Sequence, residues 1–154
     1  MKTSLGQRLL TLFYWVLALE FLLGAVTKYW PGTGPFGQDY AVKFVDWGYP
    51  AWFRFVVGAG EFTAAVLLMV ASRRSRFLGG GILVVILVGA VITHVVNRNP
   101  IGESIAAPTH LVLSALVVWI NRPEKLSDVW TRWPREFREA ALRVLRPGAR
   151  HPAV

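Results

Sequence analysis

Cysteine is absent from this chain of 154 residues. The chain therefore forms no disulfide bond, has no thiolate nucleophile and cannot hold an iron–sulfur cluster through its own thiolates. Any redox role must depend on other groups.

Acidic residues are few, with 9 Asp and Glu against 17 Lys and Arg and a net charge of +8. Such an excess can indicate nucleic-acid binding, so its placement along the chain matters. The basic residues gather at the amino end, in the segment Arg73–Arg76 and after residue 122. Positive charge concentrates on the cytoplasmic side of membrane proteins. The pattern predicts that both termini lie in the cytoplasm and that nucleic acid is not a partner.

Long polar stretches are also missing from most of the chain, which is 54% hydrophobic. About 20 apolar residues in a helix rise about 30 Å, the thickness of the bilayer hydrocarbon. Four apolar runs of roughly this length begin at Leu9, Ala51, Phe77 and Ile105. The first run carries Glu20 and has full membrane length, so we expect it to be retained rather than cleaved as a signal peptide.

We therefore predict an all-α fold, an antiparallel four-helix bundle in the membrane with both termini inside. The predicted helices cover about residues 5–28, 51–72, 76–97 and 104–121 of a transmembrane domain 1–122.

The segments outside the four runs have their own character. The outer loop 29–50 is rich in Trp, Tyr and Phe, rings that favour the head-group region. Within it, Asp39–Trp47 is predicted to form a short interfacial helix. The basic tail 123–154 is predicted to carry an amphipathic helix at about 134–146, suited to the anionic inner leaflet or to a partner subunit, with the lipid surface favoured.

Ionisable residues inside the apolar runs are the candidate site. Charged groups in hydrocarbon are costly and normally face the interior of a bundle. The orientation places these residues in the outer half of the membrane or at its middle, and the i, i+4 spacing gives each helix one polar face. We expect one outward-opening pocket. Its candidate residues are Glu20, Lys28, Arg54, Glu61, His94 and His110.

Three interpretations of these residues remain open. The carboxylates with Arg54 and Lys28 could form a buried charge network that fixes how the helices align. His and Glu beside an apolar channel could instead bind a quinone or another small molecule, since they supply hydrogen bonds and protons. A metal or haem site is the least favoured, because no Glu-x-x-His pair is present and the two histidines lie at different depths.

Short strings of residues resemble a known family. They are E-F-L-L-G-A-V-T-K-Y at Glu20–Tyr29, G-A-G-E-F at Gly58–Phe62 and a third helix that ends in His94. Over roughly residues 5–121 the chain is similar to the DoxX and DoxX-like family of small bacterial membrane proteins. The resemblance implies a four-helix bundle in the bacterial plasma (inner) membrane. Relatives include a subunit of a thiosulfate:quinone oxidoreductase and members of membrane-associated oxidoreductase complexes.

Lys28, Glu61 and His94 are the candidate residues that match the family pattern. Helical spacing alone predicts Glu20, Arg54 and His110 as candidates. We hypothesise a subunit of a quinone-linked or other membrane oxidoreductase system. Glu61 would exchange protons, and His94 or His110 would bond a ligand oxygen. Glu20, Lys28 and Arg54 would bind the ligand, with Lys28 and Arg54 holding charge at the pocket mouth.

The rival hypothesis is a non-catalytic accessory subunit of a larger membrane complex. Such a subunit would bind other membrane proteins through the aromatic loop and the basic tail. The sequence leaves open whether the chain is an enzyme.

Overall fold

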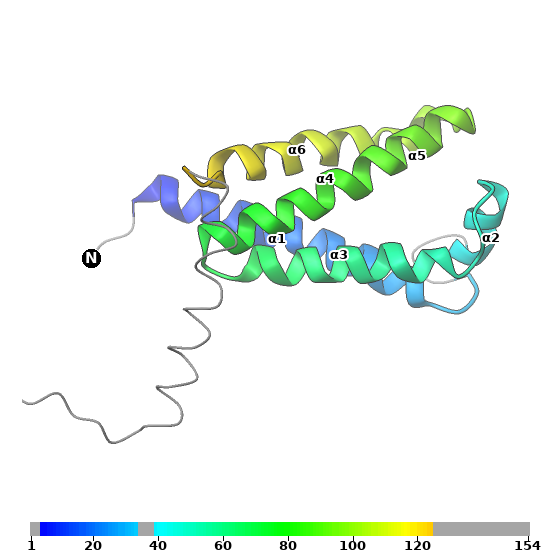
Figure 1. Ribbon diagram of the computed structural model, residues 1–154, viewed down its shortest axis with the longest axis horizontal. Helices are drawn as coiled ribbons and strands as arrows, with labels where there is room; N and C mark the ends of the chain where they lie inside the picture. Colours follow the sequence, from blue (N-terminus) through cyan, green and yellow to red (C-terminus); the bar gives the residue numbers. More distant parts are fainter. Residues whose placement is uncertain (1–3, 34–38, 125–154) are drawn as a thin grey trace, which may run out of the picture. The chain divides into compact units, whose positions relative to one another are not determined.

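The computed structural model describes residues 4–33 and 39–124, and regular structure in this part of the chain is entirely helical. The prediction of an all-α fold is thus confirmed for the described residues. The amphipathic helix predicted at 134–146 lies outside them. Figure 1 shows the arrangement. The helices are α1 (Leu5–Tyr29), α2 (Tyr40–Asp46), α3 (Phe53–Met69), α4 (Arg73–Val96), α5 (Ile101–Ser104) and α6 (Ala106–Asn121).

Polar residues define where the first two helices begin. The Ser4 hydroxyl accepts a hydrogen bond from the backbone N–H of Gln7, and the Gln7 side chain returns one to Ser4, which is a capping box. The Asp39 carboxylate accepts from the backbone N–H of Ala41 at 2.7 Å and caps α2. The chain leaves α2 through Gly48, whose φ of +82° suits glycine. A short helix therefore lies where one was predicted between Asp39 and Trp47.

The later helices differ in detail from the predicted limits. Helix α3 begins at Phe53 rather than residue 51 and ends at Met69, because Val70 is extended. Helix α4 begins three residues earlier than predicted, at Arg73, where Ser72 accepts from the backbone N–H of Ser75. The fourth predicted helix is split into α5 and α6.

Three helical stretches are long and apolar enough to cross a membrane: α1, α4 and the continuous segment Ile101–Asn121 formed by α5 and α6. Helix α3 has 17 residues and is shorter. Many large apolar side chains on these helices are exposed, for example Leu12, Val85 and Val112 at 59%, 74% and 68%. Contiguous exposed apolar surface of this kind indicates contact with lipid.

The helices pack in sequence order, α1 on α3, α3 on α4 and α4 on α6. Helices α1 and α6 are fully described and have no comparable backbone packing. In Figure 1 the α4–α6 pair lies against the α1–α3 pair at one end and separates from it toward the end that carries α2 and α5. Buried apolar side chains fill the contact between the pairs. The largest of those that are almost fully buried are Tyr14, Leu17, Leu68, Leu83 and Val117.

Glycine allows the close contact between α3 and α4. A Cβ atom added to Gly79 would lie 2.9 Å from the backbone oxygen of Ala64 and 3.0 Å from the Cβ of Leu67. Neither neighbour is the free end of a flexible side chain. Helix pairs in membranes use small residues in this way because lipid supplies no hydrophobic driving force between helices.

We expect Gly79→Ala to destabilise the folded protein by about 1–3 kcal/mol, the usual range for overpacking a close contact. Gly81→Ala is the matched control, since nothing lies within 4 Å of its added Cβ. The control should be neutral or slightly stabilising, because alanine favours helix by about 1 kcal/mol over glycine. Thermal unfolding in mild detergent measures both variants, and equal melting temperatures would contradict the packing argument.

Candidate functional site

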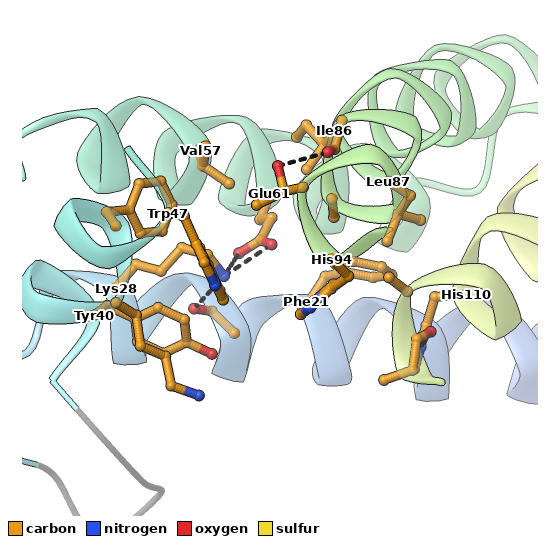
Figure 2. A pocket seen from close by; sticks show the side chains of 18 of the residues that line it. Phe21, Lys28, Tyr40, Trp47, Val57, Glu61, Ile86, Leu87, His94 and His110 are labelled. Atoms are coloured by element: carbon orange, nitrogen blue, oxygen red, sulfur yellow. Dashed lines mark hydrogen bonds and ion pairs between the residues drawn. The ribbon is translucent and has the colours of Figure 1, made fainter. Parts of the chain in front are cut away.

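A cavity of about 650 Å³ lies where the helix pairs separate. Helices α1, α3, α4 and α6 contribute to its walls, together with α2 and the segment that follows it. Figure 2 shows Lys28, Glu61 and Tyr40 toward one side of the cavity and His110 toward the other. Among the described residues, the cavity therefore joins polar groups that lie far apart in the sequence.

The strongest interaction in this cavity is an ion pair between α1 and α3. Lys28 Nζ lies 2.7 Å from Glu61 Oε2 and 2.9 Å from Oε1, so the ammonium donates to both carboxylate oxygens. Both residues are buried, with exposures of 8% and 7%. Lys28 Nζ also donates to the backbone oxygen of Gly24 and lies 4.9 Å from the centre of the Tyr40 ring. Each charge thus has close partners, as buried charges require.

A second polar contact joins α1 to α6. His110 Nδ1 lies 2.7 Å from the backbone oxygen of Ala106, and Nε2 lies 3.1 Å from Glu20 Oε2. A carbonyl oxygen can only accept, so Nδ1 carries a hydrogen in this arrangement. The Glu20–His110 contact therefore connects α1 to α6 through two side chains that can each donate or accept a hydrogen bond.

His94 lies in the last turn of α4 and forms part of the cavity wall. Its ring packs edge-on against Trp47, with centroids 5.3 Å apart. Its Nδ1 is buried and has no hydrogen-bond partner among the described residues. Buried polar atoms nearly always have a partner, so His94 has hydrogen-bonding capacity that the described protein groups do not use.

The roof of the cavity comes from α2 and the turn that follows it. The buried ring of Phe44 contacts Trp47, Tyr49 and Phe53 in an aromatic cluster. The Tyr49 and Thr93 hydroxyls are 2.9 Å apart and connect this turn to α4.

Arg54 lies elsewhere and is not one of the described residues that line the cavity. Its guanidinium donates to the backbone oxygen of Trp30 at 3.1 Å and lies 3.5 Å from the Asp39 carboxylate. Arg54 therefore contacts Trp30 and Asp39, the one after the end of α1 and the other before the start of α2, and its role at the pocket mouth stays a prediction.

The structure brings the other five predicted residues, Glu20, Lys28, Glu61, His94 and His110, to one cavity. Sequence reasoning missed the aromatic residues Phe21, Tyr40 and Trp47 as cavity walls. The many aromatic residues of the loop 29–50 indicated that it covers the bundle. The loop sequence alone did not indicate which helix each aromatic side chain would contact. Within the described residues no group of three or more His, Asp or Glu side chains is placed to hold a metal ion, so none of them is assigned as a metal ligand.

Comparison with protein families matches residues 12–119 to the DoxX-like family. The match spans more than half of the chain, and the chain belongs to this family. Neither the curated proteins nor the solved structures give a match.

We expect Lys28→Met and Glu61→Gln each to destabilise the protein by about 3–5 kcal/mol, because removing one partner of a buried pair leaves the other charge uncompensated. The double variant Lys28→Met/Glu61→Gln removes both charges and should recover part of this loss. Unfolding in detergent across the double-mutant cycle tests the coupling. Additive losses would show that the two side chains do not depend on each other.

Proposed function

We propose that this DoxX-like protein binds a small ring compound of the quinone class in the cavity and serves as a membrane subunit of an oxidoreductase system. The observation that carries this proposal is a cavity with aromatic walls and hydrogen-bonding groups on opposite sides. The groups are Lys28 with Glu61 on one side and Glu20 with His110 on the other, with His94 also on the wall.

The size and lining of the cavity suit such a ligand. Ligand pockets usually measure about 300–1,000 Å³ and combine apolar walls with a few placed polar groups. The cavity falls in this range at about 650 Å³. The rings of Phe21, Tyr40 and Trp47 could pack on a flat ring, while its carbonyl oxygens would accept hydrogen bonds from Lys28 or from a histidine.

The same groups suit proton exchange. Reduction of a quinone to a quinol takes up electrons and protons, and we propose that a redox centre in a partner subunit supplies the electrons. Glu61 would exchange protons on one side of the ring. The Glu20–His110 pair would do so on the other. Unused hydrogen-bonding capacity on His94 would orient the ligand.

The four-crossing topology is part of the proposal and is supported by helix direction. The Arg76 guanidinium lies 4.2 Å from the centre of the Tyr14 ring, so α4 starts beside the first half of α1. Their last turns both reach the cavity, through Lys28 and His94. Helices α1 and α4 therefore run in the same direction. If both cross the bilayer, the chain must return between them, and we propose that α3 is the helix that returns.

Helix α3 is long enough for this return. It has 17 residues, at the lower end of the range of about 17–25 found for membrane helices. Its start lies beside the end of α1, where the Tyr29 hydroxyl donates to the backbone oxygen of Phe55 at 3.0 Å.

Charge at the other end of the helices supports the proposed orientation. Arg73 donates to the backbone oxygen of Ile120, and Arg122 stacks on Trp119, so the arginines of both segments lie at the end remote from the cavity. By the positive-inside rule, this charge supports a cytoplasmic location for that end. We therefore propose a multi-pass protein of the bacterial plasma membrane. The transmembrane domain 1–122 would have its cavity in the outer half, and the tail 123–154 would be cytoplasmic.

A non-catalytic accessory subunit is the second candidate. Trp30 and Trp52, near the proposed outer surface, are 48% and 60% exposed. Aromatic side chains are enriched in protein interfaces and also in the membrane head-group region. A stable complex in mild detergent, purified without quinone and indifferent to added quinone, would favour this candidate.

The orientation predicts which introduced cysteine is labelled in intact cells. The natural chain contains no cysteine. Gly102→Cys, on α5, should react with a membrane-impermeant maleimide, whereas Ala71→Cys, between α3 and α4, should react only after the membrane is opened. Both positions are exposed. Labelling of Ala71→Cys in intact cells would contradict the orientation.

Quinone binding predicts a change in tryptophan fluorescence. A benzoquinone with a decyl chain should quench part of the emission of the purified protein, and Trp47→Phe should remove much of that quenching. His94→Phe, which removes a hydrogen bond worth about 1 kcal/mol but keeps a ring, should weaken binding by about fivefold to tenfold.

Trp119→Phe is the control for the fluorescence, since Trp119 stacks on Arg122 and does not line the cavity. Quenching that is unaffected by Trp47→Phe would contradict binding in this cavity.

A further inference from the structure

The seam between α1 and α6 is built differently from the other helix contacts. Helices α1 and α3, α3 and α4, and α4 and α6 all pack through their backbones, but α1 and α6 do not. Side chains bridge them instead. Asn121 donates to the Tyr14 hydroxyl at 2.8 Å, and nearer the cavity Glu20 contacts His110 at 3.1 Å.

From the Glu20–His110 bridge toward the α2 end, the seam contains side chains that line the cavity and also have a large accessible surface. Leu23 on α1 lines the cavity and is 53% exposed. The Glu20 side chain also lines the cavity and is 51% exposed. On α6, Ala106 lines the cavity and is exposed, and the adjacent Ala107 adds little bulk. The cavity wall at this seam is therefore thin, and its outer face belongs to helices whose surface is apolar.

The other sides of the cavity are closed by larger contacts. The Lys28–Glu61 pair closes the α1–α3 side. The Phe44 cluster and the Tyr49–Thr93 contact close the end under α2. Between α3 and α4 the Ile86 side chain fills the space beside Gly60, where an added Cβ would lie 2.8 Å from Ile86 Cδ1.

We propose that the ligand is a lipid-borne amphiphile whose apolar tail leaves the cavity through the α1–α6 seam, between Leu23 and Ala106. This inference rests on the proposed function and adds the class of ligand, a ring compound with a long hydrocarbon chain. The ring would lie among the polar groups of the cavity, and the tail would lie along the seam in contact with lipid. Glu20 and His110 form the boundary of the seam on the side away from α2 and meet the ligand where its ring joins its tail.

The test compares a tailless benzoquinone with the same ring carrying a decyl chain, each titrated against the full-length protein in nanodiscs. Ala106→Trp places a large ring in the seam and leaves the backbone oxygen that His110 contacts. Val112→Trp is the matched control on the same helix, because Val112 is 68% exposed and does not line the cavity. Both variants carry the same added ring. Partition of the decyl chain into lipid therefore contributes equally to the apparent affinity measured for each variant.

For the unmodified chain we expect the decyl compound to bind at least about tenfold more tightly than the tailless one, since each buried methylene is favourable. Relative to Val112→Trp, Ala106→Trp should lose most of this preference and leave the tailless compound within about twofold of the unmodified chain, and Val112→Trp should change neither. Leu23→Trp repeats the test from the other wall if Ala106→Trp does not fold, with Leu12→Trp as its control.

The possible failures are distinguishable. If the unmodified chain binds neither compound, the proposed function is wrong and this inference fails with it. If the unmodified chain binds both, but the seam variants weaken the two compounds equally or leave the decyl compound unaffected, the cavity binds quinones and the tail does not leave through this seam.

Discussion

The buried ion pair between Lys28 and Glu61 is the constraint on which the candidate site depends. Neither of these buried charges can be left without a partner, and the bidentate contact satisfies both carboxylate oxygens with one ammonium. The contact requires α1 and α3 to lie close together near the cavity. Gly58 permits this approach, since a Cβ there would lie 2.8 Å from the Tyr29 ring. The pair therefore fixes the alignment of two helices and, through them, one wall of the cavity.

The two ends of the helical unit meet different packing requirements. At the end near Arg73, small residues and Tyr14 let the two helix pairs meet, and Gly80 lies against Val117. At the other end the pairs separate, and α2 with its aromatic cluster covers the space between them. A cap of rings can cover such a space while keeping polar edges, as the Tyr49 hydroxyl does with Thr93. The cavity is thus a consequence of helices that are fixed at one end and capped at the other.

Much of the helical architecture could be predicted from apolar runs, because hydrocarbon thickness imposes one length on every crossing. The polar side chains that occupy the cavity could also be named in advance, because a charge in an apolar run must face the interior. Which of these side chains pair with one another could not be predicted. Arg54 and Glu61 share one face of α3 by spacing, yet Glu61 pairs with Lys28 whereas Arg54 turns to Trp30 and Asp39. That choice depends on the distance and rotation between α1 and α3, which helical periodicity does not specify.

The charge-network and ligand interpretations of the site are not exclusive, because different residues meet their requirements. Lys28 and Glu61 are buried, mutually satisfied and placed between packed helices, as an alignment device requires. Glu20 and His110 are partly exposed and bridge two helices whose backbones do not pack together. A group that exchanges protons or yields to a ligand must be able to change its contacts without unfolding the protein. The Glu20–His110 contact meets that condition better than the Lys28–Glu61 pair, so the stable part of the site lies between α1 and α3 and the adaptable part between α1 and α6.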